Sequence, residues 1–205
     1  MSPRNVAKDQ QLREVRREQI LDCSLQLIAK RGLDSVGMKD IANEAGVSVG
    51  NMYNYFKAKD DIISAVLERG QVGYGRMVAE MASIDKDARE KLYDICAGWI
   101  ATPKNWAFTI MLQSIRTNEM ANPDLREAAT RRFTANLQPM ADIMRQGQQA
   151  GVLIDGDPQQ LAFYFVSLIQ GLTLQLAPGY EIPVEIQAES IVRLFCAEKN
   201  SLTTQ

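Results

Sequence analysis

Apolar residues recur at helical spacing along nearly the whole chain. In the region 10–30, one face is small to apolar at positions i, i+4, i+7 and i+8: Ile20, Ser24, Leu27 and Ile28. Lys30 and Arg31 suit the negative end of a helix dipole, and Gly32 supplies a left-handed stop. The pattern therefore predicts a first helix over residues 10–30.

Strand patterns are scarce in the rest of the chain. The run GVLI at 151–154 is too short to build a sheet. Asp157 before Pro158 predicts a helix start, because an N-cap carboxylate precedes a proline at the first helical position. Further helices are predicted over 38–45, 49–56, 60–81, 85–100, 105–118, 124–147, 158–176 and 184–197. About nine helices without a sheet define an all-α protein.

The composition excludes several classes of function. The 205 residues include no histidine, which removes Ser-His-Asp and Cys-His catalysis and imidazole zinc sites. Cys23, Cys96 and Cys196 lie far apart without a CxxC pair, a pattern typical of buried thiols in a reducing cytosol. No apolar run approaches the ~20 residues that span a bilayer, and residues 1–20 lack the apolar core of a signal peptide. We therefore expect a cytoplasmic protein with no membrane partner, no metal and no cofactor.

The net charge of −2 averages two unlike parts of the chain. Residues 1–60 hold 10 Lys/Arg and 8 Asp/Glu, a balance of +2, while residues 61–205 carry −4. A mildly basic N-terminal part thus precedes an acidic remainder, so the small total charge does not exclude a nucleic-acid partner.

Residues 37–56 read GMKDIANEAGVSVGNMYNYF and fit a helix-turn-helix. Ala42 is small enough to let two helices cross closely, Gly46 can adopt the positive φ of the turn, and Met52 pins the second helix to the first. Ser48 stands where the second helix needs its N-cap. The remaining small core is apolar: Ile41, Ala45 and Val47.

An ordinary αα-corner inside a helical bundle would share this spacing, but two features favour DNA binding. The helix 49–56 presents small and amide side chains at Gly50, Asn51 and Asn54 in place of a Glu/Lys mixture, and amides pair with adenine in the major groove. Hydroxyl and ammonium groups suited to phosphates lie within and just beyond this helix: Tyr53, Tyr55, Lys57 and Lys59.

The stretch 17–67 resembles the N-terminal pattern of the TetR family of bacterial transcriptional regulators and covers about a quarter of the chain. The matching residues are Ile20, Leu21, Gly32, Ile41, Ala42, Ala45, Gly46, Val47, Ser48, Gly50, Tyr53, Phe56, Lys59 and Asp60. The resemblance implies a homodimeric DNA-binding protein. Its helix-turn-helix domain of three helices would span residues 1–60, and a larger helical domain for ligand binding and dimerisation would span residues 61–205.

Carried over position by position, the resemblance assigns DNA contacts to the second helix of the pair and to its flanks. Tyr53 and Lys59 would contact phosphates, and Lys39 would reach another. The complete set of candidate DNA-binding residues is Lys39, Ser48, Val49, Gly50, Asn51, Tyr53, Asn54, Tyr55 and Lys59. Basic residues near the N-terminus would form either an arm along the minor groove or a solvated terminus: Arg4, Lys8 and Arg13.

The sequence departs from the family pattern at several positions. Asn51 stands in place of the usual Thr and Tyr55 in place of the usual His, both on the predicted recognition helix. Ala58 replaces a Ser-like cap before the fourth helix, and Ser24 and Ile28 replace Ala and Phe as packing variations. The fold implied by the resemblance is unaffected, whereas the phosphate contacts at 51 and 55 become open.

Aromatic and thioether side chains gather beyond residue 98. Such groups line adaptable apolar pockets, although the same residues also build ordinary cores. Arg116 either pairs with Glu119 across one helical turn or points inward, where it would favour an anionic ligand. The candidate ligand-binding residues are Trp99, Trp106, Phe108, Met111, Arg116, Met120 and Met144.

The predicted helix 158–176 is apolar nearly all round, more than one subunit of this size can cover. Together with the helix 184–197 it would form a four-helix dimer interface with two-fold symmetry, which implies a palindromic operator. The predicted interface residues are Phe165, Ile169, Leu172, Leu176, Ile191 and Phe195.

The sequence therefore predicts a repressor of double-stranded operator DNA that a small apolar or amphipathic ligand releases. The alternative is a DNA-binding regulator or activator without a small-molecule inducer, controlled by a protein partner or by abundance. An enzyme is disfavoured, because the chain has no histidine and no evident paired carboxylates or activated cysteine.

Overall fold

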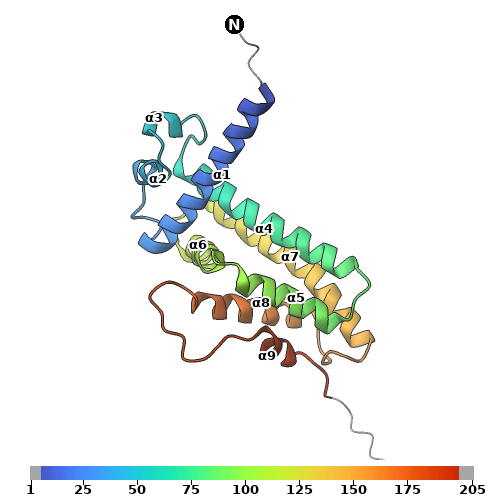
Figure 1. The fold of residues 1–205 in the computed structure, drawn as a ribbon. Coiled ribbons are helices and arrows are strands. Elements are labelled where there is room, and N and C mark those ends of the chain that lie inside the picture. Colours follow the sequence, from blue (N-terminus) through green and yellow to red (C-terminus); the bar gives the residue numbers. More distant parts are fainter. Residues whose placement is uncertain (1–5, 199–205) are drawn as a thin grey trace, which may run out of the picture. The chain divides into compact units, whose positions relative to one another are not determined.

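The computed structural model describes residues 6–198, with side chains from Lys8 onward (Figure 1). Within this range there are nine helices and no strand, which confirms the all-α prediction. The helices are α1 (Val6–Arg31), α2 (Met38–Glu44), α3 (Val49–Met52), α4 (Lys59–Ser83), α5 (Ala88–Ala101), α6 (Asn105–Thr117), α7 (Pro123–Gln149), α8 (Pro158–Leu174) and α9 (Ala188–Arg193). None of these helices is both long and apolar enough to cross a membrane.

Two helices are shorter than their patterns predict. The α3 helix ends at Met52 and not at 56, because the amides of Asn54 and Tyr55 bond to carbonyls three residues back and tighten the chain into turns. The α9 helix covers Ala188–Arg193 and not 184–197. Beyond it, the carbonyl of Phe195 accepts from the amide of Ile154 at 3.0 Å. The short apolar run near 151–154 thus pairs with the residues that follow α9.

The chain divides into two compact units, and both are discontinuous in sequence. The first unit holds the chain up to Gly70 together with Ile110–Ala129. The second unit holds Gln71–Thr109 and the chain from Thr130 onward. The long helices α4 and α7 each contribute to both units.

In the first unit, α1 lies against α2, and α2 contacts α3 (Figure 1). The apolar face of α1 is fully buried at Ile20 and Ile28, as its periodicity predicts. Arg69 of α4 forms ion pairs with two carboxylates of α1, those of Glu18 and Asp22. Gly32 ends α1 with a φ of 86°, the left-handed conformation that glycine adopts without strain.

The start of α4 is capped from inside the helix. Oδ2 of Asp61 accepts hydrogen bonds from the amides of Lys57 and Ala58, both at 3.0 Å. Ala58 has no side-chain acceptor, so the carboxylate one turn later satisfies amides that a preceding Ser would otherwise help to satisfy. The carboxylate also lies at the positive end of the helix dipole.

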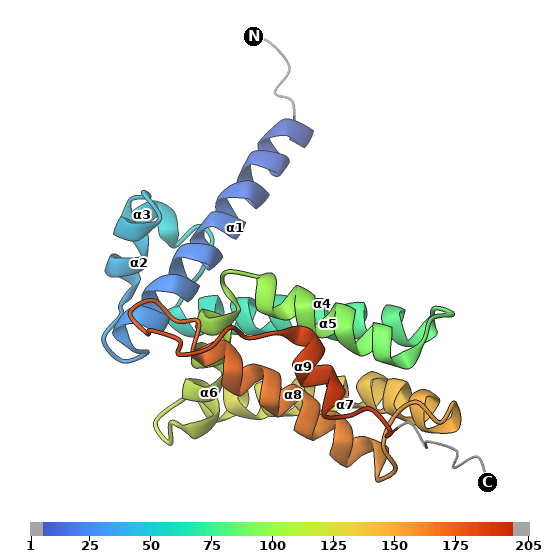
Figure 2. The ribbon, with the colours of Figure 1, turned by 60° about the horizontal axis from the view of Figure 1, so that its bottom comes forward.

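In the second unit, α5 contacts both α8 and α9 (Figure 2). The predicted start of α8 is present: Oδ1 of Asp157 accepts from the amides of Gln159 and Gln160, at 2.7 and 3.1 Å, and Pro158 occupies the first turn. Phe165 of α8 packs edge to face against Phe195, with ring centroids 5.3 Å apart.

Candidate nucleic-acid interface and effector region

The turn between α2 and α3 depends on the backbone of Gly46. Its φ is 66°, and its amide donates to the carbonyl of Asn43 at 3.2 Å. The next amide, that of Val47, donates to the carbonyl of Ala42 at 2.9 Å. A Cβ built on Gly46 would meet no heavy atom within 4 Å. Glycine is therefore favoured here by conformation and not by lack of space.

Ser48 and Met52 fix the short α3 helix at both ends. The Ser48 hydroxyl accepts from the amide of Asn51 at 3.2 Å and so caps the helix as predicted. Met52 is fully buried, which anchors α3 on the rest of the first unit. These contacts turn the opposite face of α3 outward.

That outward face carries the amide and tyrosine side chains named from the sequence. Gly50, Asn51 and Asn54 are exposed, and Tyr53 is 47% exposed. Nδ2 of Asn54 donates to Oδ1 of Asn51 at 3.1 Å, which orients the two amides relative to each other. Each amide keeps further polar atoms beyond this bond, as recognition of a base edge requires.

Two arginine side chains of α1 contact the residues that follow α3. Arg13 donates from Nη2 to the carbonyl of Asn54 at 3.1 Å, and its guanidinium lies 5.9 Å from the centre of the Tyr55 ring. Arg17, one turn later, lies 5.4 Å from the centre of the Phe56 ring. Neither contact was predicted from the sequence, although two arginines four apart on α1 match two consecutive aromatic residues after α3.

The structure gives two of the three basic N-terminal residues a helical conformation, which neither of the two alternatives considered from the sequence included. Lys8 and Arg13 belong to α1, which begins at Val6, so they do not lie in an extended segment. The residues before Gln10 show no apolar face, so the sequence did not predict that the helix begins this early. Arg4 lies outside the described residues.

The two lysines assigned to phosphates have different surroundings. Lys39 is exposed on α2. Lys59 is half-buried, and its Nζ donates to the carbonyl of Leu33 at 2.8 Å, so it also tethers the turn after α1. An ammonium group has three protons, and this bond uses one of them.

The first unit also contains the turn between α6 and α7. Asn118 donates to a carboxylate oxygen of Asp34 at 3.4 Å, and Asn122 donates to one of Asp60 at 3.2 Å. Residues close to the helix-turn-helix are thus hydrogen-bonded to a segment that follows more than sixty positions later.

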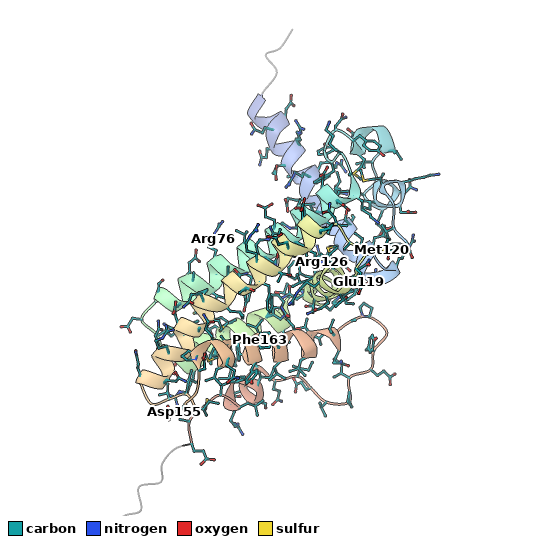
Figure 3. All side chains as sticks on the ribbon, turned by 180° about the vertical axis from the view of Figure 1, so that it is seen from behind. Arg76, Glu119, Met120, Arg126, Asp155 and Phe163 are labelled. Atoms are coloured by element: carbon teal, nitrogen blue, oxygen red, sulfur yellow. The ribbon has the colours of Figure 1, made fainter. Side chains whose placement is uncertain are left out.

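The seven candidate ligand-binding residues do not fall within one compact unit. Met111, Arg116 and Met120 belong to the first unit, and the other four belong to the second: Trp99, Trp106, Phe108 and Met144. Met111 is fully buried, Arg116 is partly buried, and Met120 is 89% exposed at the turn after α6 (Figure 3). Met120 therefore lies at the surface and not among packed side chains.

Three rings of the second unit form what we term the aromatic cluster: Tyr74, Trp99 and Phe108. The Trp99 ring meets Tyr74 at a centroid distance of 5.2 Å and Phe108 at 6.4 Å, both edge to face. Nε1 of Trp99 donates to the hydroxyl of Thr173 on α8 at 3.0 Å. Burial, with a smaller contribution from Cys96, raises the pKa of the Tyr74 phenol, which stays neutral. Tyr74 was not among the candidates, because α4 shows no aromatic pattern in the sequence.

Next to the aromatic cluster, α4 and α7 meet through polar groups that we term the polar seam: Gln71, Arg132 and Asn136. Nε of Arg132 donates to Oε1 of Gln71 at 2.9 Å, and Nδ2 of Asn136 donates to the Gln71 carbonyl at 2.7 Å. A Cβ on Gly75 would come within 2.2 Å of Oδ1 of Asn136, so glycine permits this close approach. The seam, too, was not predicted from the sequence.

Four of the six residues predicted at the dimer interface are buried in the subunit's own core. Phe165 is fully buried, and Ile169, Ile191 and Phe195 are 3 to 6% exposed. These four side chains are therefore covered within one chain, and their place at a dimer interface stays a prediction. Leu172 and Leu176 are half-buried. Three large residues on or beside α8 and α9 are exposed by 44 to 65%: Phe163 (Figure 3), Tyr164 and Leu194.

Comparison with known proteins places this geometry in a family. The family model "Bacterial regulatory proteins, tetR family" matches residues 20–66, which run from α1 through the helix-turn-helix into α4. A protein from Saccharomonospora viridis, described as a transcriptional regulator and solved in complex with choline, is 30% identical. The likeness covers 87% of this chain and 92% of that one, with a TM-score of 0.66. This chain belongs to the TetR family.

Two curated TetR-type relatives extend the likeness over most of the sequence. The regulator PksA of Bacillus subtilis is 24% identical over 200 residues, 94% of this chain and 92% of PksA. The repressor KstR of Mycolicibacterium smegmatis is 27% identical over 165 residues, 78% of this chain and 73% of KstR. The protein is accordingly a DNA-binding transcriptional regulator with a helix-turn-helix, and not an enzyme.

Proposed function

We propose that this TetR-family regulator is a homodimeric repressor that a small apolar or amphipathic molecule releases from a palindromic operator. The observation that carries the proposal is the outward face of α3, where an oriented pair of amides lies beside an exposed tyrosine. Base readout needs donors and acceptors held in a defined orientation, and the hydrogen bond between Asn51 and Asn54 supplies one.

On the DNA side, we assign base contacts to α3 and backbone contacts to its surroundings. Asn51 and Asn54 would read base edges in the major groove, with Gly50 allowing close approach of the helix. Lys39, Tyr53 and Lys59 would hold phosphates and so position the helix without reading sequence. The tether from Lys59 to Leu33 links one phosphate contact to the packing of α1.

On the effector side, the aromatic cluster is the part of the second unit best suited to an apolar molecule. Aromatic rings with one polar handle, here the indole N–H of Trp99 and its Thr173 partner, are typical of small-molecule sites. The Saccharomonospora viridis relative was solved with choline, and the curated relative KstR is named a repressor. Release would require the ligand to bind the DNA-free conformation more tightly than the DNA-bound one.

For the dimer, we assign the contact surface to the exposed apolar residues around α8 and α9. Phe163, Tyr164 and Leu194 remain accessible after the core of the subunit is packed. A two-fold axis through this surface would relate the two copies of α3 in a dimer. The operator would then need inverted half-sites separated by one turn of DNA, about 34–36 Å, or by a whole number of turns.

The proposal is tested by selecting bound sites from random DNA with the full-length protein. We expect an inverted repeat among the selected sequences. Candidate molecules, beginning with choline, are then titrated against the complex of protein and selected operator. Asymmetric single sites would contradict the palindromic dimer, and binders that leave operator affinity unchanged would contradict induction.

A regulator without a small-molecule inducer is the second candidate, and the packing of the second unit gives it some support. Trp106, Phe108 and Met144 are at most 8% exposed, as expected of an ordinary core. In that case a protein partner or the amount of the regulator would set operator occupancy. The same titration separates the two candidates, because only the first predicts a small molecule that lowers operator affinity.

A further inference from the structure

We propose that the effector carries an anionic group, such as a carboxylate, and that Arg132 on α7 binds this group. The inference rests on the proposed function, since it names the chemical class of the molecule that would act in the second unit. From the sequence, Arg116 was considered for this role. Arg132 takes its place here because its buried guanidinium has a donor without an acceptor.

The first observation is a buried donor. Nη2 of Arg132 is shielded from solvent and has no hydrogen-bond partner among residues 6–198. A buried N–H of a charged group without an acceptor is unfavourable, and native proteins rarely leave one unpaired. An acceptor supplied by a bound molecule removes this cost.

The second observation is the nature of the partner that Arg132 does have. Its Nε donates to the side-chain amide of Gln71, which is 3% exposed. An amide is neutral, so this contact leaves the positive charge of the guanidinium uncompensated. A guanidinium fork binds a carboxylate through two parallel hydrogen bonds, which would supply both the missing acceptor and the missing charge.

The third observation is the position of the polar seam beside the aromatic cluster. Gln71 and Tyr74 are three residues apart on α4, so their side chains lie on one face of that helix. Arg132 contacts the first of these residues, and Trp99 contacts the second. An amphipathic molecule could therefore place its apolar part against the rings and its acidic group at Arg132.

The seam is also held in place by its neighbours. Asn136 donates to the backbone carbonyl of Gln71, and its side chain fits closely over Gly75. This contact fixes the backbone of α4 beside α7 at the level of Arg132. The Gln71 backbone from which Oε1 extends to Nε of Arg132 is thus held in place, and Nη2 is left without an acceptor.

The test uses three probes that differ in head group: octanoate, octan-1-ol and choline. Binding to the full-length protein is measured by calorimetry for the wild type and for Arg132→Gln. The matched control is Arg131→Gln, which changes the same charge at the adjacent, exposed position. We expect Arg132→Gln to weaken octanoate binding by roughly 10- to 100-fold and Arg131→Gln to leave it unchanged. Octan-1-ol should bind all three proteins alike.

Arg132→Lys guards against a folding defect. Lysine keeps the charge and can still donate to Gln71, so its affinity for octanoate should lie between those of the wild type and Arg132→Gln. Operator binding without any probe should stay unchanged in all three variants, which reports that the protein is folded.

Three outcomes would overturn the assignment: octanoate fails to bind the wild type, both glutamine variants weaken octanoate equally, or choline binds more tightly than octanoate and ignores Arg132. In the last case choline could still release the protein from its operator. The proposed function would then be kept, and only the proposal of an anionic ligand would be rejected. Loss of operator selection would instead remove the proposed function itself.

Discussion

Two glycines four residues apart in the helix-turn-helix should respond to alanine in opposite directions. Gly46 in the turn has a φ of 66°, while Gly50 lies within the α3 helix. A Cβ at either position would meet no heavy atom within 4 Å. Neither alanine would therefore clash with a neighbouring atom, and the effect on stability should depend on the backbone conformation at each site.

The magnitudes follow from that difference. Alanine at 46 must adopt the left-handed region, which costs about 1–2 kcal/mol. Alanine at 50 reduces the conformational freedom of the unfolded chain and favours the helix, a gain of up to about 0.5–1 kcal/mol. The two variants should thus differ by about 2 kcal/mol in free energy of unfolding, or roughly 4–8 °C in melting temperature for a chain of this size.

Thermal unfolding followed by far-UV circular dichroism at one fixed protein concentration is the appropriate assay. Tryptophan fluorescence would not serve, because Trp99 and Trp106 both lie in the second unit. Operator affinity should be measured alongside, since the methyl group of Gly50→Ala projects from the face assigned to DNA. That variant should melt higher than the wild type and yet bind operator more weakly.

Equal melting temperatures for Gly46→Ala and Gly50→Ala would refute the reasoning, because the expected difference comes from the backbone conformations of the two sites. Gly46→Asn gives a further check. Asparagine tolerates the left-handed region better than alanine, so this variant should recover part of the loss. If it melts below Gly46→Ala, conformation is not the cause.

Other substitutions should separate the remaining roles. Lys59→Ala should weaken binding to all DNA sequences, and the slope of log binding constant against log salt concentration should become shallower by about 0.9. Titrations between low and moderate salt measure this slope, and an unchanged slope would show that Lys59 does not contact a phosphate. Asn54→Ala should instead cost about 1–3 kcal/mol of discrimination at one base pair with the slope preserved, and identical behaviour on specific and scrambled DNA would count against base readout. Leu194→Glu should shift the protein from dimer to monomer in sedimentation experiments, because it puts charge into the exposed apolar surface around α9; an intact dimer would place the interface elsewhere. Burial raises the pKa of the Cys96 thiol to about 11, so at pH 8 about one thiol in a thousand is ionised and alkylation should need unfolding. Because this pKa is raised above that of the unfolded chain, stability should also fall as pH rises from about 9 to 11.

Features with a local cause were predictable from the sequence. The positive φ of Gly46, the cap at Ser48 and the start of α8 at Asp157 each depend on a few neighbouring residues. The all-α class followed from periodicity for the same reason. Each of these predictions uses interactions that span one helical turn or less.

Features that depend on distant partners were not predictable. Arg13 reaches a carbonyl 41 positions away, and Lys59 reaches one 26 positions away, and no pattern along the chain encodes either pair. The apolar surface of α8 correctly indicated burial. Periodicity cannot distinguish a subunit's own core from a partner's surface. It therefore could not predict that Phe165 packs against Phe195 of the same chain.

The discontinuity of the first unit has a practical consequence for building chimeric regulators. A DNA-binding fragment of residues 1–70 would lack Ile110–Ala129. It would therefore lose the hydrogen bond from Asn118 to Asp34 and the one from Asn122 to Asp60. Its cut surface would expose side chains that the native chain covers. Grafting residues 1–70 onto another ligand-binding domain should therefore succeed only if the recipient supplies an equivalent of the α6–α7 turn. The base-reading residues come from one stretch of sequence, but the unit that holds them comes from two.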